Sequence, residues 1–309
     1  MECITIKDVA RVCGVGVSTV SRAINNHPDI NPETKEMIMQ VIKENNYVPN
    51  NSARNLKRSD ARAIAILIKG ISNQFFNSMI KVFEEEIQKK KYSLVLQHVD
   101  DNQDEVTVAI ELDETEVALE LEKEKRLRGI IFLGGIASHS QEQLKKIPVP
   151  FVLSTVSLLG KEYKNDYSFV SVDDVKESCR MTEHLISQGH EKIALLCSYK
   201  EDVSIGALRL TGYKKALEAH NIPVDERRIR HMDPELDSYS MESGYRMTKA
   251  LLEEGVDCTA IFAISDSLAI GAVRALIDAG KRVPMDISVA GFDGTEMAAY
   301  YNPSITTIR

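Results

Sequence analysis

The sequence predicts a small N-terminal helix-turn-helix domain followed by two doubly wound α/β lobes, each built on a parallel β-sheet. Two short helical segments joined at a glycine occupy residues 5–25. After residue 62, apolar runs without alternation are separated by amphipathic stretches, a pattern typical of parallel sheets covered on both faces. These runs fall into two sets along the chain, so we expect two lobes.

The helix pair begins with a capping pattern. Thr5 can cap a helix in which Asp8, three residues later, bonds back to the cap. Gly14 suits the left-handed position that ends a helix. A second helix is expected from near Val17 to about Asn25. The apolar positions expected to be buried are Ile6, Val9, Ala10, Cys13, Val20 and Ile24.

The second helix of such a motif enters the major groove of DNA. Arg22 is the strongest candidate for reading a base, because a guanidinium can bond O6 and N7 of guanine together. Capped helix pairs also occur in folds that do not bind DNA. The helix pair alone therefore does not establish DNA binding, and the residues around it are needed to distinguish the two cases. The outward-facing residues of this helix are Val17, Ser18, Thr19, Ser21 and Arg22.

A third helix and a short connecting segment follow. Asn31 can cap this helix and Pro32 suits its first position, where a missing N–H costs nothing. Its expected buried stripe is Met37, Ile38, Val41 and Ile42. The segment NNSARNLK (50–57) is compatible with a helix that is too short to be stable alone.

The run DVARVCGVGVSTVSRAIN, followed by INPETKEMIMQVIKENNYVPNNSARNLK, resembles the headpiece of the LacI/GalR (lac repressor) family of transcriptional regulators. The resemblance implies that residues 50–57 form a hinge helix on the minor groove, where Leu56 wedges a base step open; a plain linker is the alternative. Gly16 departs from the family, which usually has a serine there. The DNA-contacting residues implied beyond the second helix are Thr5, Asn25, Tyr47, Asn50, Ala53 and Leu56.

We therefore expect a headpiece over residues 1–49, a hinge helix or linker over 50–60, and a two-lobed effector-binding and dimerisation core over 61–309. The lobe boundary is expected near residue 172. The family continues through a final crossover, and this chain is expected to stop short of it.

The first set of predicted strands is AIAILI (63–68), YSLVLQ (92–97), GIIFLG (129–134), PFVLS (150–154) and FVSV (169–172). The second set is KIALLC (192–197), CTAIFAI (258–264) and ISVAGF (287–292). The predicted helices are 76–90, 174–188, 207–220, 240–254 and 266–279. The acidic stretch 100–125 is predicted to be a solvated helix or an extended loop, with a partner-binding surface as the alternative.

The core resembles the effector core of the same family, which is itself similar to periplasmic sugar-binding proteins. ALRLTGYKKAL, FAISDSLAIGAV and VPMDISVAGFDGTE are among the matching motifs. The resemblance implies that Arg209 holds ligand oxygens through a forked contact and that Asp293 accepts hydrogen bonds from ligand hydroxyls or amines. A surface arginine is the alternative for Arg209. The complete set of implied ligand-binding residues is Phe75, Phe76, Ser154, Arg209, Ser265 and Asp293.

Several of these positions have a structural alternative. Phe75 and Phe76 could pack in the lobe interface instead of bordering a ligand. Ser265 occupies a position that is often asparagine in sugar-responsive members. Asp266 is expected to be the N-cap of its helix, and His190 is expected to be structural.

Bulk properties exclude several classes of protein. The net charge is −8, but residues 1–62 carry nine basic against seven acidic residues, which leaves −10 for the remainder. Five scattered cysteines indicate reduced thiols in a cytoplasmic protein, and we expect no membrane span and no signal peptide. G-x-S-x-G, P-loop, H-E-x-x-H and metal-spaced Cys/His patterns are absent from the sequence, so no enzyme, metal or cofactor is expected.

The leading hypothesis is a cytoplasmic, homodimeric, sequence-specific transcription regulator, a repressor that binds double-stranded DNA at a pseudo-palindromic operator. A small-molecule effector, a sugar or a related metabolite, would bind between the lobes and control hinge folding. One alternative is a catabolite-control-type regulator whose co-effector is a phosphocarrier protein. Another is a solute-binding sensor without DNA function.

Overall fold

The computed structural model divides into two compact units, Met1–Asp60 and Ala61–Arg309. The residues it describes are 5–24, 29–44, 63–69, 74–99, 118, 121–122, 127–134, 144–155, 167–236 and 238–309. No helix among these residues is long and apolar enough to cross a membrane. The predicted hinge segment lies outside the described residues, as does almost all of the acidic stretch 100–125.

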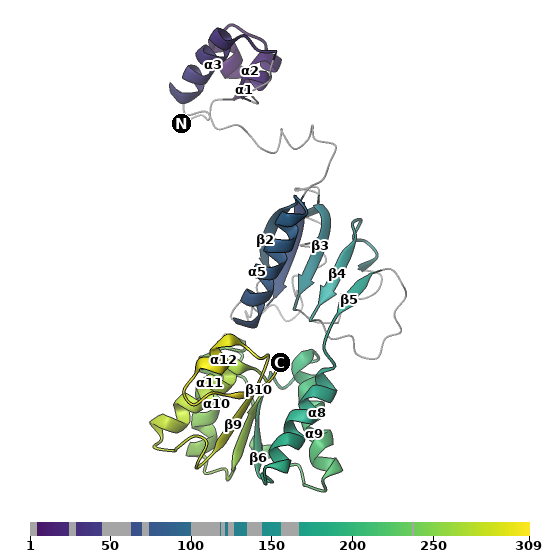
Figure 1. Cartoon of the computed structure of the whole chain (residues 1–309), viewed down its shortest axis with the longest axis vertical. Coiled ribbons are helices and arrows are strands. Elements are labelled where there is room, and N and C mark those ends of the chain that lie inside the picture. Colours follow the sequence, from purple (N-terminus) through teal and green to yellow (C-terminus); the bar gives the residue numbers. More distant parts are fainter. Residues whose placement is uncertain are drawn as a thin grey trace. The chain divides into compact units, whose positions relative to one another are not determined.

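The first unit contains three helices (Figure 1), α1 (Ile6–Val12), α2 (Val17–Ile24) and α3 (Pro32–Glu44). The capping pattern is confirmed, because the Thr5 N–H donates to Asp8 Oδ2 over 3.0 Å. Gly14 has a φ of +63°, as predicted for the residue that ends α1. The N–H of Glu33 donates to Asn31 Oδ1 over 2.9 Å, so Asn31 caps α3.

The core of this unit is small. Its fully buried side chains are Val9, Ala10, Val20, Ala23 and Ile38. The expectation for Met37 is wrong, because its side chain is 43% exposed. The other apolar residues that were expected to be buried pack against this core but are only partly buried, namely Ile6, Cys13, Ile24, Val41 and Ile42.

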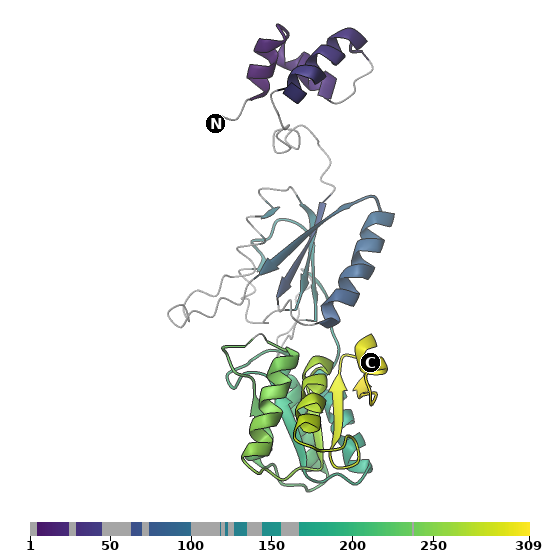
Figure 2. The same cartoon turned by 90° about the vertical axis from the view of Figure 1, so that its left-hand side faces the viewer.

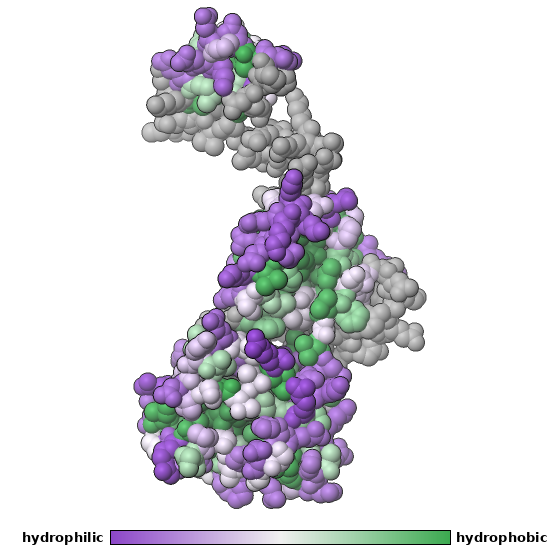
Figure 3. Space-filling model, viewed as in Figure 1, coloured by the Kyte–Doolittle hydropathy of each residue, from purple (hydrophilic) through white to green (hydrophobic). Residues whose placement is uncertain are grey.

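The first lobe of the second unit is a five-stranded, wholly parallel sheet in the order β2-β1-β3-β4-β5. Its strands are β1 (Ala63–Lys69), β2 (Ser93–Val99), β3 (Leu127–Leu133), β4 (Phe151–Ser154) and β5 (Ser168–Val170). Helix α5 (Gln74–Lys89) buries Phe76 and Ile87 against it. The outer surface of α5 is largely hydrophilic (Figure 3), because Glu84, Glu85 and Glu86 are exposed there.

The second lobe holds another parallel sheet, in the order β10-β9-β8-β6-β7. Its strands are β6 (Ile193–Cys197), β7 (Ile229–His231), β8 (Ala260–Ala263), β9 (Ser288–Phe292) and β10 (Thr306–Ile308). The helices are α8 (Asp174–Ser187), α9 (Ile205–Ala219), α10 (Met241–Glu253), α11 (Asp266–Asp278), α12 (Glu296–Tyr300) and the 3-10 turn η1 (Glu226–Arg228). Helices α8 and α9 cover one face of the sheet, and α10 and α11 cover the other (Figures 1 and 2).

The predicted order of strands and helices is confirmed, but two strands, the short helix α12 and the 3-10 turn η1 were not predicted. β7 and β10 are three residues long and lie at the two edges of the second sheet. Their sequences, Ile-Arg-His and Thr-Thr-Ile, lack the continuous apolar run by which the central strands were identified. Edge strands need fewer apolar residues, because a neighbouring strand covers only one of their sides.

Helices α10 and α11 cross at two glycines. A Cβ on Gly244 would lie 2.1 Å from the carbonyl oxygen of Leu268, and a Cβ on Gly271 would lie 2.0 Å from that of Met241. Each glycine therefore lets its helix approach the backbone of the other. This crossing fixes α11, whose first turn carries residues of the site described below.

We predict that Gly271→Ala lowers the free energy of unfolding by about 3 kcal/mol, because the added methyl group forces the two backbones apart. Gly280→Ala is the matched control, since Gly280 has a φ of +73° but no atom within 4 Å of an added Cβ. Gly280→Ala should lower the free energy of unfolding by about 1 kcal/mol, which is the strain of placing alanine in a left-handed conformation. Urea denaturation of both variants measures this, and an equal loss in the two would contradict a steric role for Gly271.

Candidate functional site

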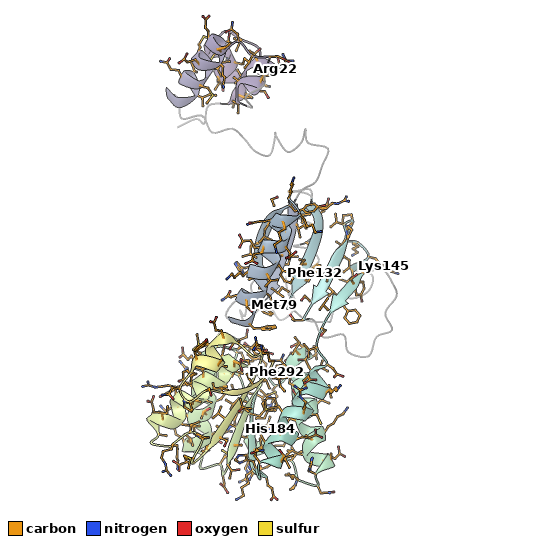
Figure 4. The ribbon with its side chains drawn as sticks, in the orientation of Figure 1. Arg22, Met79, Phe132, Lys145, His184 and Phe292 are labelled. Carbon is orange, nitrogen blue, oxygen red and sulfur yellow. The ribbon has the colours of Figure 1, made fainter. Side chains whose placement is uncertain are left out.

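A buried arginine lies at the carboxyl end of the second sheet. Arg209, on α9, has a side chain only 8% exposed, and its Nε donates to Asp174 Oδ1 over 2.9 Å. Its Nη1 donates to the carbonyl oxygen of Ile264 and, at 3.5 Å, to Asp293 Oδ1. Its Cζ lies 3.6 Å from the centroid of the Phe292 ring. Phe292 is labelled in Figure 4. The alternative of a surface arginine is therefore wrong.

The strand ends explain this convergence. Ile264 follows β8 and Asp293 follows β9, and the carboxyl ends of neighbouring parallel strands meet at one edge of a sheet. Asp293 has a φ of +108°, which a non-glycine residue adopts only when it is held there. Its N–H donates to the Ile308 carbonyl over 3.0 Å, and the N–H of Gly294 donates to Thr307 Oγ1 over 3.2 Å. Strand β10 thus fixes the loop that presents Asp293.

Asp266 has a different role from the one expected. Ser265 is the N-cap of α11, because its side chain accepts from the N–H of Leu268 over 3.2 Å. Asp266 lies in the first turn and accepts from Thr295 N and Oγ1 over 2.7 and 2.9 Å, and from Thr307 Oγ1 over 2.6 Å. The predicted capping role of Asp266 is therefore wrong, and its carboxylate ties α11 to the Asp293 loop.

This tie requires a glycine in β9. A Cβ on Gly291 would lie 2.3 Å from Asp266 Oδ1, so a side chain there would displace the carboxylate. Burial raises the pKa of Asp266, while the hydroxyl and backbone donors of Thr307 and Thr295 act in the opposite direction.

Sequence reasoning missed Asp174. It follows Asp173, whose side chain caps α8 by accepting from the N–H of Lys176 over 3.0 Å. The same arrangement occurs in α11, where the cap Ser265 precedes the buried acid Asp266. A capping residue followed by an acid, directly after a strand, was the signal that could have identified both carboxylates.

The cluster keeps hydrogen-bonding capacity. Among the described residues, Asp293 Oδ2 is buried without a hydrogen-bond partner, and no hydrogen bond from Arg209 Nη2 is found. Burial raises the pKa of Asp293 to about 7, with Asp266 and Asp174 acting in the same direction and Arg209 against them. An unused acceptor and an unused guanidinium nitrogen thus lie beside an aromatic ring, a set suited to a ligand with several polar groups.

The other expected ligand residues belong to the first lobe. Ser154, the last residue of β4, is buried, and its carbonyl oxygen accepts from the N–H of Gly134 over 3.0 Å. Phe76 is buried in a cluster with Ile66 and Leu133, and the Phe75 ring lies 5.8 Å from it. Phe76 therefore contributes to the core of the first lobe, whatever else it contacts.

His190 was expected to be structural. Its Nδ1 lies 3.0 Å from Thr259 Oγ1, and it precedes β6 at the end of the sheet opposite Arg209. Burial lowers its pKa. Among the described residues, no group of three or more His, Cys, Asp and Glu side chains could hold a metal ion.

The predicted DNA-reading residues are distributed along α2. Val17, Ser18 and Arg22 are exposed (Figure 4 labels Arg22), whereas Thr19 and Ser21 are half-buried. Thr5 is exposed at the start of α1. Five predicted DNA-binding residues lie outside the described residues, namely Asn25, Tyr47, Asn50, Ala53 and Leu56.

Gly16 precedes α2 in a conformation open to a side chain. An added Cβ would have its nearest neighbour, Ser18 Oγ, at 3.6 Å. A serine would fit there, so the departure from the family is not enforced by packing.

The fold and these two sites define a DNA-binding transcription regulator with a binding-protein-like core. A model of the bacterial regulatory proteins of the lacI family matches residues 5–50, and a periplasmic binding protein-like domain matches residues 182–309. The chain is 42% identical over 308 residues to the HTH-type transcriptional regulator MalR of Clostridium butyricum, covering 98% of this chain and 87% of that protein. It therefore belongs to the LacI family of transcription regulators.

Other relatives are consistent with this assignment. Catabolite control protein A of Priestia megaterium is 32% identical over 99% of this chain and 87% of its own length. The lac repressor dimer bound to operator and the anti-inducer ONPF matches with a TM-score of 0.65 and 26% identity, over 99% of this chain and 87% of that one. A CelR–cellobiose complex matches with a TM-score of 0.63 and 26% identity, over 98% and 87%. These relatives are transcription regulators, so a solute-binding sensor without DNA function is not supported.

We predict that Arg209→Met lowers the free energy of unfolding by about 3–5 kcal/mol at pH 8, because it leaves buried carboxylates unneutralised. The loss should be smaller at pH 6. Burial raises the pKa of Asp293 in the folded state above its unfolded value, so protonation at low pH stabilises the folded form and that stability is lost as the pH rises through about 7.

The matched control is Arg274→Met. Arg274 pairs with Asp278 over 2.9 Å on the exposed surface of α11, where its side chain is 66% exposed. Water screens the attraction within an exposed pair, so this substitution should leave the free energy of unfolding almost unchanged. Urea denaturation at the two pH values measures both variants, and a loss for Arg209→Met that does not depend on pH would contradict the assigned electrostatic cause.

Proposed function

We propose that this regulator is a repressor whose operator affinity is set by a neutral, hydroxyl-rich effector, a sugar or a related metabolite, held by Arg209 and Asp293. The observation that carries this proposal is the buried Oδ2 of Asp293, which has no hydrogen-bond partner among the described residues and lies beside an arginine whose hydrogen bonds to these residues run from Nε and Nη1. Each sugar hydroxyl can donate one hydrogen bond and accept up to two, so neighbouring hydroxyls of one sugar can bond both the guanidinium and the carboxylate.

The aromatic ring and the relatives support the same ligand class. Phe292 packs against the Arg209 guanidinium and holds it in place from one side. One structural relative is a complex with cellobiose, a neutral disaccharide. We assign the cluster a binding role, and we assign Ser265 to shaping the pocket, because its hydroxyl already caps α11.

In the DNA-binding headpiece, Arg22 reads a base, and Val17 and Ser18 contact neighbouring base edges in the major groove. All three side chains are exposed on α2, which supports this assignment. Residues 1–49 act as the headpiece, 50–60 as the hinge and 61–309 as the effector and dimerisation core. The protein acts as a homodimer in the cytoplasm, and a twofold protein requires a pseudo-palindromic operator.

A second candidate keeps the DNA function but changes the effector. The resemblance to catabolite-control-type regulators implies a phosphocarrier protein as co-effector, and the chain is 32% identical to Catabolite control protein A over 99% of its length. Calorimetry separates the two candidates. A sugar effector gives a binding signal when it is titrated into the regulator without any other protein. A phosphocarrier co-effector changes the affinity of the regulator for its operator when no sugar is present.

We predict that Arg22→Ala abolishes the preference for the operator over random duplex, because the bidentate contact to guanine contributes about 1–3 kcal/mol of discrimination. Binding-site enrichment at fixed salt measures this preference. Arg11→Ala is the control, since Arg11 is exposed on α1 and pairs with Asp8. Unchanged selectivity of Arg22→Ala would remove it from the base-reading set.

We predict that at least one neutral sugar in a panel containing cellobiose raises the Tm of the wild-type protein and fails to do so in Arg209→Lys. Lysine keeps the charge but has no fork with which to bind two groups at once. Thermal-shift assays measure this. Equal stabilisation of wild type and variant would place the sugar elsewhere.

A further inference from the structure

The Arg209 cluster has an excess of acid. Three carboxyl groups interact electrostatically with this one guanidinium, those of Asp174 on α8, Asp266 on α11 and Asp293 after β9. The side chains of Asp174 and Asp293 are each only 3% exposed. Three buried negative charges against one positive charge are costly, because burial disfavours the charged form of each acid. The cluster is therefore more stable when one of the three acids is protonated.

The hydrogen bonds of the three acids indicate which of them carries this proton. Asp266 accepts three hydrogen bonds from two threonines, and Asp174 accepts a bond of 2.9 Å from Arg209 Nε. Asp293 receives from Arg209 only a contact of 3.5 Å on Oδ1, and its Oδ2 has no partner among the described residues. Donors stabilise the charged carboxylate, so Asp293 is the acid that loses least on protonation.

We propose that Asp293 carries a proton on Oδ2 in the effector-free protein at and below neutral pH, and that a neutral sugar binds with release of this proton to solvent. The proposal rests on the proposed function, in which a sugar hydroxyl donates to Asp293. Because the side chain is already buried, the sugar removes little further water from it. The new donor therefore favours the charged carboxylate, and the proton leaves.

The charged groups that face Asp293 act in both directions, and burial together with the two neighbouring acids outweighs the arginine. Asp266 and Asp174 favour its neutral form, and Arg209 favours its charged form. The ring of Tyr239, in the turn before α10, interacts electrostatically with Arg209 and Asp293, but burial raises its own pKa and keeps it neutral. Burial raises the pKa of Asp293 to about 7, so the proton is lost within the physiological range.

The consequence is an effector response that depends on pH. A site that must lose a proton of pKa about 7 before binding gains about tenfold in affinity from pH 6 to pH 8. The regulator would then respond more weakly to the same sugar concentration when the cytoplasm becomes acidic.

The first test uses the full chain without any ligand. NMR of protein labelled with 13C at the aspartate carboxyls should show one signal that titrates with a midpoint between about pH 6 and 8. Asp293→Asn should remove this signal. Asp286→Asn is the matched control, because Asp286 is exposed and bonded to Arg282, which lowers its pKa to about 2. A midpoint below about pH 5 for all aspartates, or a signal that persists in Asp293→Asn, would overturn the proposal.

The second test uses cellobiose as the probe. Calorimetry at pH 6, 7 and 8 should show the Kd falling about tenfold across this range, and buffers of different ionisation enthalpy should report release of about half a proton at pH 7. A Kd independent of pH, or proton uptake, would overturn the release step. Absence of binding by cellobiose and by the rest of the neutral-sugar panel would overturn the sugar assignment, while the carboxyl titration decides the place of the proton independently.

Discussion

The second lobe depends on one buried guanidinium that neutralises the carboxyl groups around it. Arg209 connects four elements, because it lies on α9 itself and its partners follow β8 and β9 and begin α8. Asp266 extends the network to β10 through Thr307. A charge at this position therefore has two consequences. It holds the carboxyl ends of the strands together, and it leaves polar groups whose hydrogen bonds are unused.

The unused groups are what distinguish a binding site from a structural ion pair. A purely structural pair is stable when every buried oxygen has a donor. Asp266 meets that condition with three donors, whereas Asp293 does not. The left-handed conformation of Asp293 leads to the same conclusion, since strain at a residue held by its surroundings is typical of functional positions.

Much of the fold was predictable because the central strands are buried on both faces. The continuous run Ile193–Cys197 could form no other element at that length between helical patterns. The edge strands β7 and β10 were missed because their stability comes from one neighbour rather than from their own composition. Arg209 and Asp293 were found by family resemblance, which carries over positions but not contacts.

The contacts themselves were not predictable. The position of Asp174 directly after the cap Asp173 marks it as a candidate, but its hydrogen bond with Arg209 is known only once α8 is placed against the sheet. Ser265 and Asp266 were misassigned by one residue, because either side chain could cap a helix. The hinge over residues 50–60 stays a prediction from family resemblance.

Coupling between the effector site and the headpiece is the central claim, and thermodynamic linkage tests it most directly. If a sugar held by Arg209 changes operator affinity by some factor, saturating operator must change the affinity for that sugar by the same factor. We predict equal factors of about 5–150 when operator Kd is measured with and without the sugar and sugar Kd is measured with and without operator. A sugar that binds at Arg209 and leaves operator Kd unchanged would contradict the account.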